Sequence, residues 1–393
     1  MEPIISSSTP LNILMASDAP KRREGGVAAI IYNLGREMEE LGHTVTYVFQ
    51  EDLGPWAGVP QRFKELIFSV RLAKYIVKNR RKFSVVNLHG PNGFPYGILR
   101  RMPHRGDYPP FIMTLHALEE WRAYAMSREA RKGRAWNFSL KNRLWHRLYH
   151  FQRFAWSIRT ADGVHAVCRD VWVMLQLKYG LDSDRITYIP SGIERRFFAP
   201  REYHGGGGVR LLYAGTWLDQ RGIFYLRDAL RELVRKLPDL KMTFAGCGVP
   251  PQEIEEFFGP ELRGRIEVRP VVPYDKMQDL YAEHDVFLFP TLMEALPLVI
   301  QEAMAAGMPV ITTETCGMPD LIENEFNGLL IPTANASAIE EAVLRLAGSS
   351  EMRRRLGEAA RETTKRRTWE RSGRQLEALY RRVLDLERAR REA

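Results

Sequence analysis

The stretch between residues 286 and 313 most restricts what this chain can fold into. Residues 286–289 (Val-Phe-Leu-Phe) form a wholly apolar run, which is typical of a strand buried on both faces of a parallel sheet. Residues 298–306 are rich in helix formers and are followed by the helix stop Gly307, after which residues 310–313 begin a further apolar run. This order predicts a strand, a loop, a helix and a second strand parallel to the first.

Two carboxylates lie in this otherwise apolar unit. Glu294 falls in the loop after the first strand, where open α/β sheets bind ligands, and Glu302 follows about two helical turns later. Eight steps of about 100° make two turns and about 80°, which would bring both side chains to one half of a helix. A helix-capping Glu294 and a solvated Glu302 are the ordinary alternative. The apolar neighbours of Glu302 leave little room for a solvated stripe, so its carboxylate needs partners such as ribose or sugar hydroxyls.

The same alternation of apolar runs and helical stretches occurs twice along the chain. The expected strands are residues 11–15, 44–49, 85–88, 111–115, 163–167 and 186–189, then 209–214, 241–245, 266–268, 286–289 and 310–313. The pattern breaks near a run of four glycines, residues 205–208, which has the composition of a flexible linker. We therefore expect two α/β doubly wound domains, residues 1–190 and 209–368, joined by a linker at 191–208 and followed by an Arg-rich helix at 369–393.

Composition supports a globular protein with an anionic partner. A chain of 393 residues with 45% hydrophobic content suits two domains. The amino-terminal residues lack a signal-peptide pattern, and no run reaches the roughly 18 apolar residues of a membrane span, so we expect a cytoplasmic protein whose membrane contact is peripheral. The three cysteines have neither disulfide nor zinc spacing and are expected to pack in the core. The formal net charge of +9 suggests nucleic acid, phospholipid or a phosphorylated acceptor without choosing among them.

The two carboxylates and their surroundings resemble a known family. Their spacing, with Pro-Thr at 290–291 and Glu-Ala-Met-Ala-Ala-Gly-Met-Pro-Val at 302–310, resembles the Glu-x7-Glu signature of the retaining GT-B glycosyltransferases (glycosyl transferases group 1, family 4). A weaker resemblance extends from Gly25-Gly26 to residues 327–332. It implies a GT-B architecture, with two Rossmann-like domains facing a central cleft. The first domain would bind the acceptor, the second would bind the nucleotide-sugar donor, and the terminal helix would cross back to the first domain.

Two loops are expected to hold the donor diphosphate. Gly25 and Gly26 precede a helix, so their backbone amides could approach a pyrophosphate, although an ordinary turn would look the same. The loop Gly215-Thr216-Trp-Leu-Asp-Gln-Arg221-Gly resembles the family's Gly-Arg-x4-Lys-Gly loop, with Arg221 at the Lys position and Thr216 at the Arg position. A solvated Arg221 is the alternative, but a cation at a helix start is unfavourable unless an anion binds there.

Because Thr216 removes one positive charge, its hydroxyl or another base, Arg195 or Arg196, must compensate. The resemblance also implies that Glu294 lies near the donor hexose hydroxyls and Glu302 on the ribose hydroxyls. Ala-Leu-Pro at 295–297 stands where Gly-Phe-Gly is commoner, which stiffens this loop. The expected donor-binding set further includes the base-framing region and the residues that open the helix: Val271, Leu296, Pro297, Leu298 and Val299.

Two histidines follow predicted strands at their carboxyl ends. A core or capping role would explain His116 from the residues alone, whereas the resemblance implies a His beside the donor sugar that supports the transition state. We therefore expect His116 and Glu294 as catalytic residues and His89 on the acceptor side. Neither an Asp-x-Asp nor a His/Cys cluster stands in a plausible strand-end position, so we expect neither a metal nor another cofactor. The nucleotide sugar is a substrate. Retention would then follow front-face attack, with the leaving phosphate taking the acceptor's proton.

Residues 122–159 are rich in arginine and aromatic side chains and resemble an interfacial surface that could dock on an anionic membrane. A helical stripe of Leu140, Leu144, Leu148, Phe151 and Ala155 fits core packing equally well.

The sequence thus predicts a retaining hexosyltransferase that extends a saccharide or lipid-linked acceptor in cell-surface polysaccharide or glycolipid synthesis, with no nucleic-acid partner. The alternatives are a GT-B nucleotide-sugar epimerase, or a non-catalytic basic protein that binds membrane or nucleic acid on the same scaffold.

Overall fold

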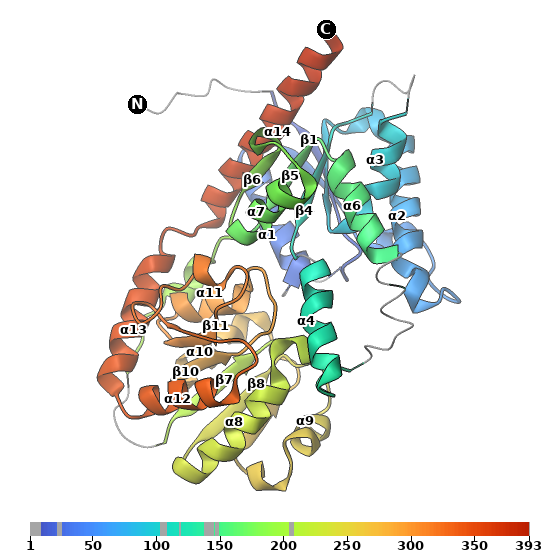
Figure 1. The fold of residues 1–393 in the computed structure, drawn as a ribbon. Helices are drawn as coiled ribbons and strands as arrows, with labels where there is room; N and C mark the ends of the chain where they lie inside the picture. Colours follow the sequence, from blue (N-terminus) through green and yellow to red (C-terminus); the bar gives the residue numbers. More distant parts are fainter. Residues whose placement is uncertain are drawn as a thin grey trace.

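A computed structural model describes residues 9–21, 26–102, 108–117, 119–136, 145, 149–203 and 208–392. Its core is two six-stranded sheets, and all strand pairs in both sheets are parallel. Helices flank each sheet, and the two α/β bodies lie one above the other (Figure 1). The predicted fold class, two doubly wound α/β domains, is confirmed.

The first sheet has the strand order β2-β1-β3-β4-β5-β6. Its strands are β1 (Asn12–Ala16), β2 (Thr44–Val48), β3 (Val85–His89), β4 (Phe111–Leu115), β5 (Gly163–Ala166) and β6 (Ile186–Tyr188). Every residue of β3, β4 and β5 is buried, as expected for strands covered by helices on both faces. The order reverses between β1 and β3, which is a topological switch point.

The second sheet has the order β12-β11-β10-β7-β8-β9. Its strands are β7 (Arg210–Ala214), β8 (Lys241–Ala245), β9 (Ile266–Arg269), β10 (Val286–Phe289), β11 (Val310–Thr313) and β12 (Leu329–Ile331). The short edge strand β12 was not predicted, because three residues are too few to show a period. The order reverses between β7 and β10, so the loops after these two strands meet at the second switch point.

The helices before the second sheet are α1 (Gly26–Glu40), α2 (Gln61–Lys78), α3 (Phe94–Arg100), α4 (Glu119–Arg131), α6 (Phe151–Thr160) and α7 (Arg169–Tyr179). Those that follow are α8 (Ile223–Lys236), α9 (Pro251–Phe258), α10 (Met277–Glu283), α11 (Leu298–Ala305), α12 (Ala336–Ala347), α13 (Ser350–Thr364) and α14 (Trp369–Glu392). The sequence pattern also favours a helix over residues 136–159, and this prediction is wrong at its start. Gly133 has a φ of 71°, which ends the preceding helix, and Trp136 lies in a bend.

The last helix, α14, packs on the first sheet rather than on the second. Asn87 Nδ2 in β3 donates to the Tyr380 hydroxyl at 2.7 Å, and both groups are buried. A Cβ on Gly163 of β5 would lie 2.8 Å from a Val383 methyl, so glycine permits the close approach of strand and helix. The chain therefore returns to its first half, whereas residues 204–207 of the predicted linker lie outside the described residues.

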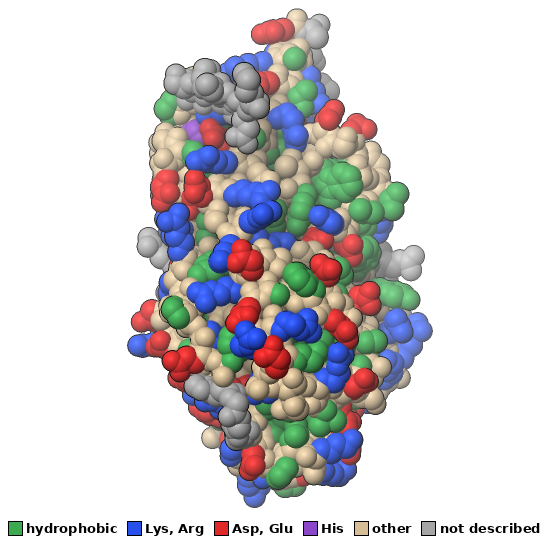
Figure 2. Space-filling model, turned by 90° about the vertical axis from the view of Figure 1, so that its left-hand side faces the viewer, with side chains coloured by type: hydrophobic (Ala, Val, Ile, Leu, Met, Phe, Trp, Pro, Cys, Tyr) green, Lys and Arg blue, Asp and Glu red, His purple; other side chains and the backbone are tan. Residues whose placement is uncertain are grey.

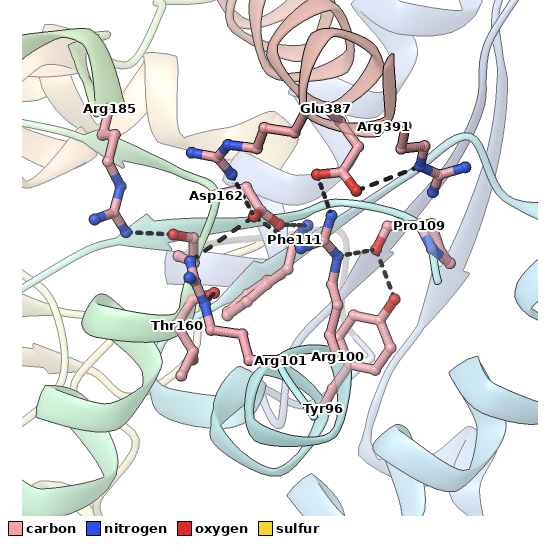
Figure 3. Close-up of polar contacts among 12 residues, drawn as sticks. Tyr96, Arg100, Arg101, Pro109, Phe111, Thr160, Asp162, Arg185, Glu387 and Arg391 are labelled. Atoms are coloured by element: carbon pink, nitrogen blue, oxygen red, sulfur yellow. Dashed lines mark hydrogen bonds and ion pairs between the residues drawn. The ribbon is translucent and has the colours of Figure 1, made fainter. Parts of the chain in front are cut away.

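The far end of α14 is held by a cluster of arginines around one buried carboxylate (Figure 3). Asp162 accepts a hydrogen bond from the Phe111 backbone N–H at 2.8 Å and pairs with Arg100 at 2.9 Å. Arg100 also pairs with Glu387 of α14 at 2.7 Å, and Arg390 lies 3.9 Å from Asp162. The cluster lies at the amino ends of β4 and β5, on the edge of the first sheet away from its switch-point loops.

The carboxyl ends of the two sheets face each other. The Sγ atoms of Cys168, which follows β5, and Cys316, which follows β11, lie 3.8 Å apart, and both thiols are free and buried. Beside them the Arg169 backbone N–H donates to Asp320 Oδ2 at 2.7 Å. A Cβ on Gly317 would lie 1.6 Å from the Ala295 carbonyl oxygen and 2.9 Å from the Cys168 Cβ, so only glycine fits at this contact. The cysteines pack as predicted, but two of them do so across the junction between the sheets.

Candidate active site

Arg221 and Glu294 meet at the switch point of the second sheet. Arg221 follows β7, Glu294 follows β10, and Arg221 Nε lies 3.2 Å from Glu294 Oε1. The guanidinium also lies 5.2 Å from the centre of the Phe289 ring. Gly215 has a φ of 138°, and a Cβ on it would lie 1.9 Å from Arg221 Nη1. A glycine is therefore required for Arg221 to fold back against the end of β7.

The start of α11 adds backbone donors without a side-chain cap to the same place. Pro297 precedes the helix and gives it no side-chain cap, so the first amides, at Leu298 and Val299, are available to an anion. Leu298 also packs against a cluster of buried side chains centred on the first sheet. The expected phosphate-facing segment thus lies where the two sheets meet.

Glu302 is buried and is held by protein groups that the sequence did not indicate. The Tyr281 hydroxyl donates to Glu302 Oε2 at 2.8 Å, and the Tyr274 hydroxyl lies 3.3 Å from Oε1. The Tyr274 hydroxyl also lies 2.8 Å from Glu194 Oε1, and its one proton cannot serve both carboxylates. Burial raises the pKa of Glu302 to about 7. Ribose hydroxyls were the expected hydrogen-bond partners of the Glu302 carboxylate, and the hydroxyls of Tyr274 and Tyr281 supply part of this hydrogen bonding.

Arg196 belongs to this Glu302 cluster. Its guanidinium lies 3.9 Å from the centre of the Tyr274 ring and pairs with Glu194 at 3.1 Å. Arg195 is exposed. Thr216 is exposed as well, and its backbone carbonyl accepts a hydrogen bond from the Tyr213 hydroxyl at 3.2 Å. The proposed compensation for the missing charge at Thr216 stays a prediction.

His116 and His89 form a stacked pair at the carboxyl ends of β4 and β3. His89 Nδ1 lies 2.8 Å from His116 Nε2. Burial lowers the pKa of His116 to about 3 and that of His89 well below its ordinary value, so both rings are neutral. The assignment of His89 to the acceptor side stays a prediction; the residue is only 1% exposed and lies against His116.

The tautomers of the two histidines follow from the hydrogen bonding of one buried ring nitrogen, His89 Nε2. Among the described residues, His89 Nε2 has no hydrogen-bond partner. An unpaired buried N–H is less well tolerated than an unpaired lone pair. We therefore assign the shared proton to His89 Nδ1, which donates to His116 Nε2. His116 then carries its own proton on Nδ1 and can donate one hydrogen bond.

The remaining predicted donor residues lie at differing depths. Gly25 falls outside the described residues, whereas Gly26 opens α1 with a φ of 62° and has free space where a Cβ would stand. Val271 is 79% exposed in the loop after β9. Leu296 is buried, so only its backbone could reach a ligand. Pro297 is half-buried.

Asp18 and Asn92 lie at the switch point of the first sheet and were not predicted. Asp18 follows β1, and its Oδ1 accepts a hydrogen bond from Asn92 Nδ2 at 3.0 Å. Burial raises the pKa of Asp18. The available signal was position, since a polar residue directly after a buried strand marks the ligand edge of such a sheet.

The basic segment at 122–159 does not form one exposed surface. Arg153 is buried, pairs with Glu65 at 2.6 Å and donates to Ser69, so it cannot reach a lipid. Residues 137–144 and 146–148, with most of the expected leucine stripe, lie outside the described residues. Among the described residues of this segment, the exposed basic side chains are Arg128, Arg131, Lys132 and Arg159. Tyr124, Arg128 and Arg131 share one face of α4 and are here called the α4 stripe.

One face of the molecule carries mixed charge (Figure 2). On the face shown in Figure 2, basic and acidic side chains alternate, with a group of hydrophobic side chains near one edge.

A cavity of about 390 Å³ lies at the amino ends of β7, β8 and β9, where Arg210, Lys241 and His284 line it, on the edge opposite to Arg221 and Glu294. Within the described ranges, no three His, Cys, Asp or Glu side chains are grouped to hold a metal ion. No helix in that part of the chain is long and apolar enough to cross a membrane.

Comparison with known proteins agrees with this geometry. Residues 24–197 match the model of Glycosyltransferase Family 4, and residues 198–363 match that of Glycosyl transferases group 1. A glycosyltransferase of Methanocaldococcus jannaschii is 23% identical over 360 residues, which are 88% of this chain and 91% of that protein. The amylovoran biosynthesis glycosyltransferase AmsK of Erwinia amylovora is 26% identical over 184 residues, 45% of each protein. Sucrose-phosphate synthase from Thermosynechococcus elongatus superposes with a TM-score of 0.79 at 18% identity, covering 96% of this chain and 100% of that one. The two-sheet architecture is thus GT-B.

Proposed function

Because this chain belongs to the group 1, family 4 glycosyltransferases, we propose that it is a retaining enzyme that moves a hexose-type sugar from a nucleoside-diphosphate donor to a saccharide or lipid-linked acceptor. The observation that carries the proposal is the contact of Arg221 with Glu294 at the second switch point. The guanidinium and the uncapped start of α11 can bind the diphosphate of a sugar nucleotide, and the carboxylate can bind its sugar hydroxyls.

The leaving diphosphate would be met by cationic and dipolar groups. Arg221 supplies the fixed positive charge. The backbone amides of Leu298 and Val299 lie at the amino-terminal end of α11, where the helix dipole is positive. Gly26, at the start of α1, gives a second helix end with room for a close approach. These groups act where negative charge develops as the bond between the anomeric carbon and the diphosphate oxygen breaks.

Retention needs the acceptor to enter from the face that the diphosphate leaves. In the proposed step, the acceptor hydroxyl forms a bond to the anomeric carbon, and its proton passes to the departing phosphate oxygen. Glu294 would bind donor sugar hydroxyls, with one carboxylate oxygen on Arg221. His116, neutral and protonated on Nδ1, would donate to the donor sugar and stay neutral throughout, because its pKa is about 3.

The acceptor class is supported by more distant arguments. The relative AmsK is named for biosynthesis of a polysaccharide, amylovoran. The net charge of +9 favours a phosphorylated or membrane-linked acceptor, and the α4 stripe offers exposed arginines for an anionic surface. We therefore propose a cytoplasmic enzyme that meets its acceptor at the inner face of the cell membrane.

The test begins with donor binding. Thermal shift with UDP-, GDP- and ADP-hexoses should reveal one favoured donor, since a ligand at a hundredfold excess over its Kd stabilises by about 2.7 kcal/mol. Transfer to a model saccharide, followed by NMR of the new anomeric centre, then reports retention or inversion, and parallel reactions with EDTA report any metal requirement.

Each rival has its own outcome in this test. An epimerase would release free nucleotide or an isomerised sugar without any acceptor. A non-catalytic protein would show no shift with any nucleotide sugar while binding nucleic acid or anionic vesicles in a salt-sensitive manner. An inverted product would refute the proposed mechanism but leave the transferase activity.

A further inference from the structure

One segment joins the predicted catalytic histidine to the predicted diphosphate loop. Residues 119–136, here called the strap, begin three positions after His116 and end on the second α/β body. Figure 1 shows α4, the helical part of the strap, running between the two bodies. The contacts described below join the strap to the loop 215–222 and to α8, and then join that loop to the residues before Glu294.

The centre of the strap contact is the buried carboxylate of Glu129, which has the exposed Lys132 beside it. The Tyr225 hydroxyl of α8 donates to Glu129 Oε2 at 2.6 Å, and Lys132 Nζ lies 2.9 Å from Glu129 Oε1 and 3.0 Å from the Tyr225 oxygen. Glu129 and Tyr225 are each only 4% exposed. A buried carboxylate that lost one of these partners would be left under-bonded, so the group strongly favours the docked position.

A second contact reaches the diphosphate loop itself. The Trp136 backbone N–H donates to Asp219 Oδ2 at 2.6 Å, and Asp219 Oδ1 accepts from the Gln220 backbone N–H at 2.8 Å. The Trp136 ring lies 6.3 Å from the ring of Trp217. Asp219 stands two residues before Arg221, so the strap fixes the turn that carries the guanidinium.

The diphosphate loop, residues 215–222, is in turn hydrogen-bonded to the loop that bears Glu294. The Leu292 backbone N–H donates to the Gln220 carbonyl at 2.8 Å. The chain of contacts therefore runs from the strap through Asp219 and Gln220 to the residues directly before Glu294. Resting on the proposed function, we propose that the strap holds the diphosphate loop in place from the first α/β body, and that Glu129, Tyr225 and Asp219 are positioning residues for Arg221.

The test uses variants that change single atoms of the buried group. Tyr225→Phe removes the hydroxyl, and Glu129→Gln removes the charge. Tyr96→Phe is the matched control, since its hydroxyl donates to the Pro109 carbonyl at 2.6 Å within the first body and has no contact across the junction. Hydrogen exchange of the amides at 215–222 reports the loop without any need for activity.

We expect exchange in the loop to rise about tenfold or more in both strap variants and to stay unchanged in the control, because a hydrogen bond to a charged group is lost. The KM for the donor should rise about tenfold while kcat changes less, and the double variant should match the single ones because they break one contact. Should Glu129→Gln fail to fold, Arg134→Gln tests the same docking through the half-exposed pair with Asp228, which is 2.8 Å long.

Unchanged exchange at 215–222 in every strap variant would overturn the positioning role. So would equal effects in Tyr96→Phe. If exchange rises as expected but wild-type protein binds none of UDP, GDP or ADP, the strap proposal stands as a statement about the loop and the proposed transferase function fails.

Discussion

Replacing Glu302 with glutamine should stabilise this protein at neutral and alkaline pH while weakening nucleotide binding. Burial raises the pKa of Glu302 from 4.5 to about 7 in the folded protein. The folded protein therefore holds this proton more tightly than the unfolded chain. Stability from this group is fully present below pH 4.5 and is lost as the pH rises through 7.

The size of the effect follows from the two pKa values. A shift of one pKa unit is worth about 1.36 kcal/mol, so an ionised Glu302 costs the folded state about 3 kcal/mol at pH 8. Glutamine mimics the protonated acid, since its amide accepts from Tyr281 and donates toward the Tyr274 oxygen. Relative to wild type, the Glu302→Gln variant should gain about 2 to 3 kcal/mol of unfolding free energy between pH 5 and pH 8.

Urea unfolding at a series of pH values measures this directly, provided that both proteins show the same m-value. Titration calorimetry with the preferred nucleoside diphosphate supplies the second readout. Affinity should fall about tenfold or more, since a charged acceptor for the ribose hydroxyls is lost. If the unfolding free energies of wild type and Glu302→Gln changed with pH in the same way, burial would not raise the pKa of Glu302. Unchanged affinity in the folded variant would remove Glu302 from the nucleotide site.

The other predictions concern the junction and the surface. Arg221→Ala should raise the donor Kd by about tenfold or more and slow transfer, because Thr216 leaves the diphosphate with no second cation in this loop; normal turnover would move the phosphate site elsewhere. His116→Ala should depress kcat more than donor affinity. If the activity of the wild-type enzyme changed with pH near pH 6.5 and this change were absent in the variant, His116 would not be neutral as its lowered pKa requires. The thiol oxidant diamide should join Cys168 to Cys316 by removing one hydrogen from each thiol, since their Sγ atoms lie 3.8 Å apart. The disulfide should stop turnover reversibly, and mass spectrometry showing two free thiols after oxidation would count against it. Changing the two arginines of the α4 stripe to Gln should release the protein from anionic vesicles at low salt, and equal sedimentation of variant and wild type would exclude the stripe as a docking face.

Much of the fold could be read from local pattern. Wholly apolar runs such as residues 286–289 mark strands buried on both faces, and their alternation with helical stretches gives a parallel sheet. The conformational role of Gly215 and the helix start after Pro297 are also local properties. Boundaries were less accurate where a short element lacks a period, as at β12, or where one glycine ends a helix, as at Gly133.

The site was only partly readable, because its partners come from distant parts of the chain. The sequence pointed to Arg221 and Glu294 separately, and only the strand order, which places β7 beside β10, brings them to 3.2 Å. The sequence showed that Glu302 needs partners, but not that Tyr274 and Tyr281 supply them. It placed His89 at a strand end, and only packing decided that the ring lies against His116.

What the sequence alone determined was therefore the set of elements and the loops that carry chemistry, since both depend on neighbours within a few residues. Tertiary structure decided which loops meet, which charges are buried and which arginines are exposed, because these depend on contacts between segments far apart in the chain. Arg153 illustrates the difference. Its local surroundings resemble a membrane-binding face, yet the pairing with Glu65 of α2 buries it in the first α/β body.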